Sequence, residues 1–461
     1  MIKAMFFLCV LLGVRLALFA QDCHCTDEFQ FVKGYMEKNY AGFRDKVTPD
    51  TRGRYDSVST DIARRIGLVH NPAYCIGLMK EWLGFFRDRH NYINAIAGKA
   101  IRPGPVEVIR LSPQMLTLLK ARRKGVEGIY HTSDSTYTIA IVRSKKTDRD
   151  FVGVIVSSRA ATWKPGQVKL ELLRVSDTLF LACSYLRDHS MDPESFVFDG
   201  RSLGRGIWIR NGVRGPKVVQ QQWPAVQARR LSATTYYIGI GTFDESNAVA
   251  VDSLIQADSA VLATVPNLVL DLRGNSGGSD FVASPLWPWI YAGPIFGNGV
   301  DVLATDDNVK GWSALLAAKD IPDDNKDYLR GVIAQMQAAQ PGQLVNVTKD
   351  ESVTLPEVRS FPKKIVVLVN GECASSAEQF LLGAMQSRKV TVMGQPTAGI
   401  LDYANVRDVV LPCLPFTLHY ATSRSRRVDL GKGIDNVGIQ PNVLLGADKD
   451  WVEEARRYLE K

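Results

Sequence analysis

The stretch VVLVNGECASSAEQFLLGAMQ at 366–386 decides the fold. Its first four residues belong to an uninterrupted apolar run from Ile365 to Val369. Such a run is typical of a strand that is buried on both faces of a parallel sheet. A short turn containing Gly371 follows, and the apolar spacing then becomes helical. A strand, a tight turn and a helix in this order predict an α/β domain.

Ser375 and Ser376 lie where this predicted helix begins. Backbone N–H groups and the dipole at the start of a helix favour negative charge. An attacking alkoxide and a tetrahedral oxyanion both need such an environment. The same residues also have a purely structural explanation, because Ser375-x-x-Glu378 is a capping box. The segment alone leaves a nucleophile and a helix cap both open.

A second segment, NLVLDLRGNSGGSD at 267–280, runs from a predicted strand into a glycine-rich turn. Glycines such as Gly277 and Gly278 let the backbone approach a ligand closely and direct N–H groups at it. This suits one half of an oxyanion hole. It would also suit phosphate binding, but the Lys-Ser/Thr pair of a P-loop does not follow.

Taken together, the two segments resemble the tail-specific (C-terminal processing) and tricorn-type serine proteases of peptidase family S41. Two shorter pieces extend the resemblance, VMGQPTAG at 392–399 and GIQPNV at 438–443, so that it covers about 230–448. The resemblance implies an α/β fold with a crotonase-like (ClpP-like) catalytic domain and acyl-transfer chemistry on peptide bonds.

The resemblance also implies the roles of the residues around the nucleophile. Ser375 takes the position of the nucleophile, with Ser376 as the neighbouring candidate. The N–H groups of Ser376 and of Gly277 or Gly278 would form the oxyanion hole.

The general base is expected to be a histidine. The tail-specific branch uses a Lys just after the Pro-Thr-x-Gly turn, but Ile400 and Leu401 follow that turn here. The tricorn-type branch uses a His from the N-terminal helical part and a late acid. His90, in Asp88-Arg89-His90, resembles the family's Asp-x-His. The alternative explanation is a surface histidine at the end of a helix, where the helix dipole favours a cation.

The late acid is expected to be Asp435. It precedes the segment Gly438-Ile439-Gln440-Pro441 and takes the position of the family's Glu, with a side chain one methylene shorter. A turn-capping Asp is the alternative explanation. In the triad Ser375–His90–Asp435, the imidazole would remove the serine proton and the carboxylate would hold the imidazole tautomer.

The N-terminus predicts export. Lys3 precedes an apolar stretch that ends at Ala20, as in a cleavable secretory signal, and Arg15 argues against a permanent span. No second long apolar run follows. We therefore expect a secreted or periplasmic protein without a stable membrane span.

Four parts are predicted along the chain. These are a signal peptide at 1–20, a helical region at 21–99, a β-rich module at 100–225 and the catalytic domain at 226–461. Alternating strands such as 136–142, 151–156 and 168–173 predict a small barrel or sandwich in the module.

Charge and cysteines narrow the possible partners. Loss of Lys3 and Arg15 with the signal leaves 54 basic against 48 acidic residues. The sequence contains no basic arm of the kind that would indicate nucleic-acid binding. The cluster Arg424, Arg426 and Arg427 is expected to be a solvated loop or a site for a substrate carboxylate. No cofactor or metal is expected, because the one candidate metal cluster, Cys23-His24-Cys25, is not followed by a second ligand pair at zinc spacing.

Export permits disulfides, and a bridge between Cys373 and Cys413 is one prediction. Two buried thiols are the alternative. The function that these observations favour is an exported serine endopeptidase acting on peptides or unfolded proteins. A non-catalytic ligand- or peptide-binding protein on the same fold, and another kind of hydrolase, remain the alternatives.

Overall fold

The computed structural model describes residues 24–69, 71–99, 105–213, 226–317 and 323–461. The predicted signal peptide and Cys23 lie outside the described residues. None of the helices in the described ranges combines the length and apolar composition needed to cross a bilayer.

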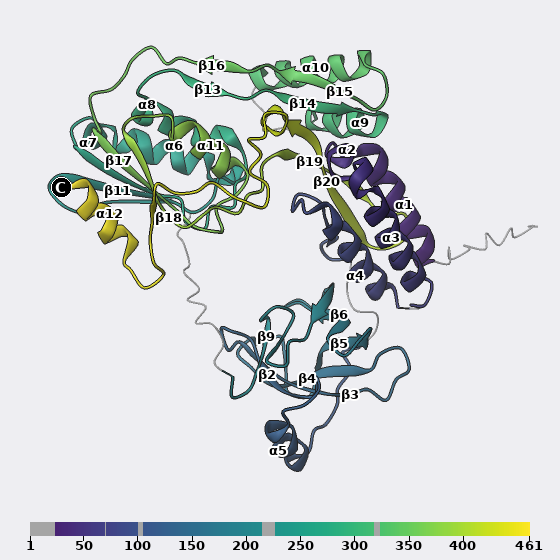
Figure 1. The fold of residues 1–461 in the computed structure, drawn as a ribbon. Coiled ribbons are helices and arrows are strands. Elements are labelled where there is room, and N and C mark those ends of the chain that lie inside the picture. The colour runs from purple at the N-terminus through teal and green to yellow at the C-terminus, as the bar shows by residue number, and fades with distance from the viewer. Residues whose placement is uncertain (1–23, 70, 100–104, 214–225, 318–322) are drawn as a thin grey trace, which may run out of the picture.

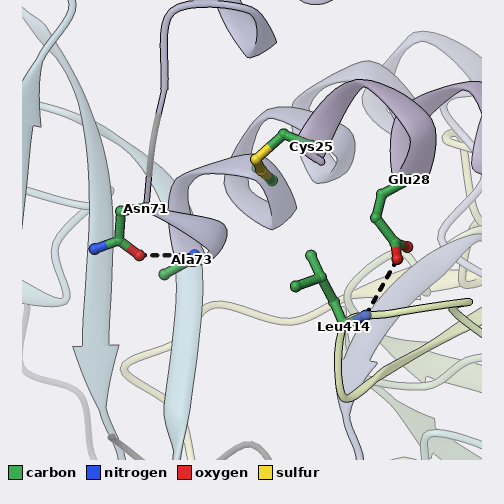
Figure 2. Close-up of a disulfide and its surroundings, with 6 residues drawn as sticks. Cys25, Glu28, Asn71, Ala73 and Leu414 are labelled. Atoms are coloured by element: carbon green, nitrogen blue, oxygen red, sulfur yellow. Dashed lines mark hydrogen bonds between the residues drawn. A yellow bond between two sulfur atoms is a disulfide. The ribbon is translucent and has the colours of Figure 1, made fainter. Parts of the chain in front are cut away.

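The N-terminal helices form a bundle beside the C-terminal strands (Figure 1). Helix α4 begins with Pro72 in its first turn, and the Asn71 side chain caps it by accepting the N–H of Ala73 at 2.9 Å (Figure 2). A disulfide between Cys25 and Cys75 joins the first and fourth helices. The bundle consists of α1 (Cys25–Asn39), α2 (Phe43–Lys46), α3 (Pro49–Ile66) and α4 (Pro72–Leu83), followed by the 3₁₀ turn η1 (Gly84–Phe86).

The β-rich module is one antiparallel sheet of eight strands. The strands predicted at 136–142, 151–156 and 168–173 are confirmed as β3, β4 and β5. The two ends of this strand order, β7 and β8, are joined by an antiparallel bridge between Phe198 and Leu203 and by a hydrogen bond from the Gly204 N–H to the C=O of Val197 at 3.0 Å. The elements are α5 (Pro113–Ala121), β2 (Gly128–His131), β3 (Tyr137–Arg143), β4 (Phe151–Ser158), β5 (Val168–Arg174), β6 (Leu179–Tyr185), β7 (Met191–Val197), β8 (Ser202–Leu203) and β9 (Trp208–Arg210).

The predicted α/β region is built on a six-stranded sheet in the order β10-β11-β12-β17-β18-β21. All neighbours are parallel except the edge strand β10. Its strands are β10 (Val226–Arg230), β11 (Thr235–Ile240), β12 (Asn267–Asp271), β17 (Lys364–Val369), β18 (Val390–Gly394) and β21 (Val443–Leu444). Helices α6 (Ala248–Ala257) and α11 (Ser376–Ala384) cover one face, and α12 (Trp451–Leu459) covers the other (Figure 1).

A third sheet joins the two ends of the chain. Strand β1 (Tyr92–Ala95) pairs antiparallel with β20 (Phe416–Ser425), which also pairs with β14 (Val300–Ala304) and β19 (Tyr403–Val410). The sequence did not predict this sheet. It brings the segment just after His90 beside the strand that follows the nucleophile region. The remaining elements are α7 (Ser259–Leu262), α8 (Trp287–Ile290), α9 (Asp306–Leu315), α10 (Asp323–Ala338), β13 (Ile295–Gly297), β15 (Gln343–Thr348) and β16 (Glu351–Val353).

Candidate active site

Ser375 lies in the sharp turn between β17 and α11. Its backbone has φ 53° and ψ −122°, a conformation that costs energy for any residue with a side chain. The Ser375 N–H donates to the C=O of Ile400 at 3.0 Å and to the carboxylate of Glu378 at 3.2 Å. These contacts hold the strained turn, which presents a half-buried serine at the start of a helix.

The glycine-rich turn lies directly against this serine. Gly277 has φ 95°, and a Cβ atom built on it would be 2.8 Å from the Cβ of Ser375 and 2.9 Å from the nitrogen of Ser376. The Ser376 hydroxyl donates to the C=O of Gly278 at 3.0 Å. Only glycine permits both the backbone angle and this close approach.

Two backbone N–H groups beside Ser375 are available to a ligand. The N–H of Gly277 donates to the Asn275 side chain at 3.0 Å, so it is already used. The N–H groups of Gly278 and Ser376 donate no hydrogen bond within the described residues. Of the two glycines considered for the oxyanion hole, Gly278 is therefore the one whose N–H has no acceptor there.

Glu378 does more than cap the helix. Its side chain is fully buried and accepts the N–H of Gly399 at 2.7 Å, the N–H of Ile400 at 2.8 Å and the hydroxyl of Thr397 at 2.5 Å. The capping box that the sequence suggests thus holds the loop after β18 against the nucleophile turn. Ile400, at the position of the missing lysine, contributes its backbone to this contact.

Asp435 lies on the loop next to that segment. One of its carboxylate oxygens accepts the N–H groups of Leu401 at 2.9 Å and Asp402 at 2.8 Å. Asp402 in return accepts the N–H groups of Ile434 and Asp435 at 2.6 and 2.8 Å. Burial, and next the charge of Asp88, raise the pKa of the Asp435 carboxyl to about 7.

His90 follows the helical bundle, in the loop before β1. The Asp88 carboxylate accepts the His90 N–H at 2.9 Å and lies 3.8 Å from Nδ1 of the ring. Nδ1 is buried and makes no hydrogen bond within the described residues. Burial raises the pKa of Asp88, and the charge of His90 opposes that rise. The carboxylate nearest to the ring is therefore Asp88, which the sequence showed only as part of a motif.

The loops of His90 and Asp435 touch each other. The Asn436 side chain donates to the C=O of Arg87 at 2.7 Å, and the charges of Asp88 and Asp435 interact. No hydrogen bond joins His90 to Ser375 or to Asp435 in the part of the chain that the structure describes. Ser375, Ser376, Gly277 and Gly278 are in direct contact, whereas Asp435 and His90 reach this group through their loops.

Several basic residues are placed differently from expectation. Arg424 and Arg427 are buried, so a solvated loop is wrong for both. Arg424 pairs with Asp45 at 2.5 Å and with Asp429 at 2.7 Å, which ties the helical bundle to β20. No pattern in the sequence pointed to the pair with Asp45, because the two residues are far apart along the chain.

The predicted bridge between Cys373 and Cys413 is wrong. Cys373 is a free, buried thiol that donates to the C=O of Leu272 at 3.0 Å, and burial raises its pKa to about 12. Cys413 is disulfide-bonded, but near α1, where its N–H donates to Glu28 at 2.6 Å. Figure 2 shows Glu28 and Leu414 beside the Cys25 disulfide. The fold thus places the two cysteines in different parts of the molecule.

The described residues contain no cluster of His, Cys, Asp or Glu that could hold a metal ion. Cys25, from the one candidate cluster, is part of the disulfide with Cys75.

Comparison with known proteins identifies the family that the chain matches. Residues 234–445 match the model of peptidase family S41, a range that includes both glycine and nucleophile turns and Asp435 but not His90. This part of the chain belongs to peptidase family S41. As an S41 member it is a serine-type peptidase, and hence a hydrolase. No curated protein matches its sequence.

Solved structures resemble this chain over most of its length. Mature CPAF, in complex with lactacystin, is 15% identical with a TM-score of 0.50, covering 95% of this chain and 97% of CPAF. The photosystem II D1 C-terminal processing protease is 12% identical with a TM-score of 0.40, over 95% and 98% of the two chains. A putative peptidase from Parabacteroides merdae is 12% identical with a TM-score of 0.43, over 94% and 93%. At such identity the likeness to CPAF shows a mixed α/β fold in common and no more.

Proposed function

We propose that this chain is an exported serine endopeptidase that cleaves peptide bonds through an acyl-enzyme formed on Ser375. One observation carries the proposal. Ser375 stands in a strained turn at the start of α11, beside two N–H groups, of Gly278 and Ser376, that have no acceptor within the described residues. A nucleophile next to a preformed pair of donors is what acyl transfer requires.

The proposed reaction proceeds in two stages. His90 removes the proton from Ser375 Oγ, which attacks the carbonyl carbon of the scissile peptide bond, and the N–H groups of Gly278 and Ser376 bind the oxyanion. His90 then donates the proton to the leaving amine as the C–N bond breaks. Water, deprotonated by His90, attacks the ester and releases the carboxylate product.

Asp435 is proposed as the acid that supports His90. One of its oxygens accepts two backbone N–H groups, and this fixes the side chain, while the other oxygen accepts no hydrogen bond within the described residues. The contact between Asn436 and Arg87 holds the two loops together, and closure of the site on substrate would have to bring the ring within hydrogen-bond distance of the Asp435 carboxylate. Apo sites often tighten in this way when substrate binds.

The arrangement of domains is part of the proposal. Residues 226–461 would be a crotonase-like catalytic domain, preceded by the helical region at 21–99 and the β-rich module at 100–225. The module would position substrate and supply no catalytic residue. Cleavage of a signal at 1–20 would place the protein outside the cytoplasm or in the periplasm. The Cys25–Cys75 disulfide supports an oxidising compartment.

A serine-directed fluorophosphonate probe tests the nucleophile. The wild-type protein should be labelled, and Ser375→Ala should lose the label. Ser376→Ala is the matched control, because it removes the neighbouring hydroxyl but keeps the N–H proposed for the oxyanion hole. Labelling that survives Ser375→Ala and disappears in Ser376→Ala would assign the nucleophile to Ser376.

Peptidase kinetics test the base and the acid. His90→Ala should lower kcat about a thousandfold or more, and Asp435→Asn should lower it substantially less. Lys432→Ala, which removes an exposed lysine from the same loop, should have little effect. Full activity in His90→Ala together with a dead Lys432→Ala variant would make this a lysine-based site.

A non-catalytic binding protein is the second candidate. The observation that favours it is the missing hydrogen bond between His90 and Ser375 among the described residues. Wild-type protein that binds an extended peptide, yet neither cleaves it nor reacts with the probe, would support this function instead.

A further inference from the structure

Arg427 occupies the space between the nucleophile's helix and the acid's loop. Its side chain is buried, with 6% of the residue exposed. Nη2 donates to the Gln379 side chain at 3.2 Å, and Gln379 lies one turn into α11 from Ser375. Nε donates to the Ser425 hydroxyl at 2.7 Å and lies 3.5 Å from the Asp402 carboxylate.

The Asp402 contact extends to the proposed acid. The Asp402 carboxylate accepts the N–H of Asp435, and Asp435 accepts the N–H of Asp402. The Ser375 N–H donates to the C=O of Ile400, two residues before Asp402, and so connects the nucleophile turn to the same segment. A continuous set of contacts therefore runs from the nucleophile to the acid loop, and through Arg427 back to the nucleophile's helix.

The charges around Arg427 are mainly negative. Burial lowers the pKa of Arg427, and Asp402, Asp435, Glu378 and Asp280 oppose that change in decreasing order. A guanidinium stays protonated under these conditions. Its positive charge therefore opposes the negative charge of these four carboxylates.

The surroundings of Asp435 show what this cation does there. The groups that interact electrostatically with Asp435 include the carboxyls of Asp88 and Asp402, the phenol of Tyr403 and the guanidinium of Arg427. Asp88 and Asp402 raise the pKa of Asp435, whereas a cation favours its ionised form.

We propose that Arg427 is a positioning residue of the active site, which holds the acid loop against the nucleophile's helix and places a cation beside the Asp402–Asp435 pair. The inference rests on the proposed function of Ser375, His90 and Asp435. A role as the site for a substrate carboxylate fits less well, because an acidic group entering there would meet the same four carboxylates.

The test compares Arg427→Gln, Arg427→Lys and a matched control, Arg426→Gln, which removes the same charge from the neighbouring residue. The readouts are kcat and KM against pH, the rate of probe labelling and thermal unfolding. Arg427→Gln should lower kcat by about ten- to a hundredfold with little change in KM. Its pH–rate profile should also shift to higher pH on the acid side.

The lysine variant separates charge from geometry. Arg427→Lys should keep the acid side of the profile near that of wild type but lose part of the rate, because an ammonium lacks the planar fork that spans Gln379 and Asp402. Arg426→Gln should match wild type in both its rate and its pH–rate profile. If Arg427→Gln does not fold, Gln379→Ala removes the partner on α11 and should lower kcat without moving the profile.

The outcomes separate this inference from the proposed function. Wild-type activity that does not depend on Ser375 would overturn the proposed function. Activity that depends on Ser375, with a wild-type rate and pH profile in Arg427→Gln, would overturn the role of Arg427 alone. A wild-type kcat in Gln379→Ala would show that the contact between Arg427 and Gln379 does not position the active site.

Discussion

Single residues in this site are defined by backbone conformation as much as by side-chain chemistry. Ser375 has a positive φ of 53°, and Gly277 and Gly278 have φ of 95° and 139°. The strain at Ser375 persists because Glu378 and Ile400 hold its N–H. Backbone strain of this kind is concentrated at functional sites, where surrounding contacts over-determine it.

Gly277→Ala should abolish activity and lower stability. The new Cβ would lie 2.8 Å from both the Ala374 oxygen and the Ser375 Cβ, so the nucleophile turn must move. We expect a loss of about 2 kcal/mol or more in the free energy of unfolding. Gly431→Ala is the control, because Gly431 has φ 64° but open space around its Cβ position. Equal effects of the two variants on activity would contradict the close contact. The measurements are denaturant unfolding and probe labelling.

The activity should depend on pH through Asp435. Burial and the Asp88 charge raise the pKa of Asp435 to about 7, so its carboxylate becomes protonated as the pH falls through that value. The ionised form is the one that supports His90, and kcat/KM should therefore rise as the pH increases through about 7.

The matched variants for this profile are Asp435→Asn and Asp448→Asn. The first should have a low rate with a weaker dependence on pH, because the titrating carboxyl is gone. The second changes an exposed carboxylate of the C-terminal segment and should leave the profile as in wild type. A wild-type profile that is flat between about pH 6 and pH 8 would exclude this role for Asp435.

At the scale of elements, α11 is held to its surroundings by one buried carboxylate. Glu378 is fully buried and accepts donors from the loop that follows β18, as well as the N–H of Ser375. The helix, the nucleophile turn and this loop therefore behave as one unit. A carboxylate that accepts several backbone N–H groups is stable in such a place, whereas donors left without it are not.

Glu378→Gln should destabilise the protein by about 2–4 kcal/mol, because one amide oxygen replaces two charged acceptors and an NH₂ group faces N–H donors. Probe labelling should fall as well. Glu372→Gln, an exposed glutamate in the preceding turn, should change stability by less than about 0.5 kcal/mol. Chemical denaturation measures both variants. An unchanged free energy of unfolding for Glu378→Gln would show that the loop is held by other contacts.

At the scale of the whole molecule, the two ends of the chain form one structure. Strand β1 pairs with β20, and Phe416, Leu418 and Tyr420 of β20 are buried in the core that also includes the N-terminal helices. The same core includes residues of the eight-stranded sheet, such as Tyr130 and Leu170. The predicted regions are thus separate in sequence but share a hydrophobic core.

A fragment of residues 226–461 should not fold independently. It would expose the three apolar side chains of β20, each of which contributes about 1.5–3 kcal/mol when buried. It would also lack the base, His90. We expect an insoluble product or one without a cooperative thermal transition, and no probe labelling. Mixing with a fragment that carries residues 24–225 is the control, and recovery of labelling would show that the two parts reassemble. A fragment that melts cooperatively and is labelled at the wild-type rate would contradict this expectation.

The sequence alone was sufficient for the features that depend on local patterns. The continuous apolar run before Ser375 is the buried strand β17, and the serine-glutamate spacing forms the capping box of α11. These features could be predicted because periodicity, capping and glycine conformation act over a few residues. The family, too, followed from short motifs within 267–443.

Only the tertiary structure decided which distant residues meet. It pairs β1 with β20, places Asp88 nearest to His90, buries Arg427 between Gln379 and Asp402, and separates Cys373 from Cys413. No pattern along the chain encodes these contacts, because each joins segments brought together by packing. An arginine in a loop and a thiol near a serine look the same in sequence whether they are solvated or buried. Burial and partners are properties of the folded molecule, and they determine the charge balance around the proposed triad.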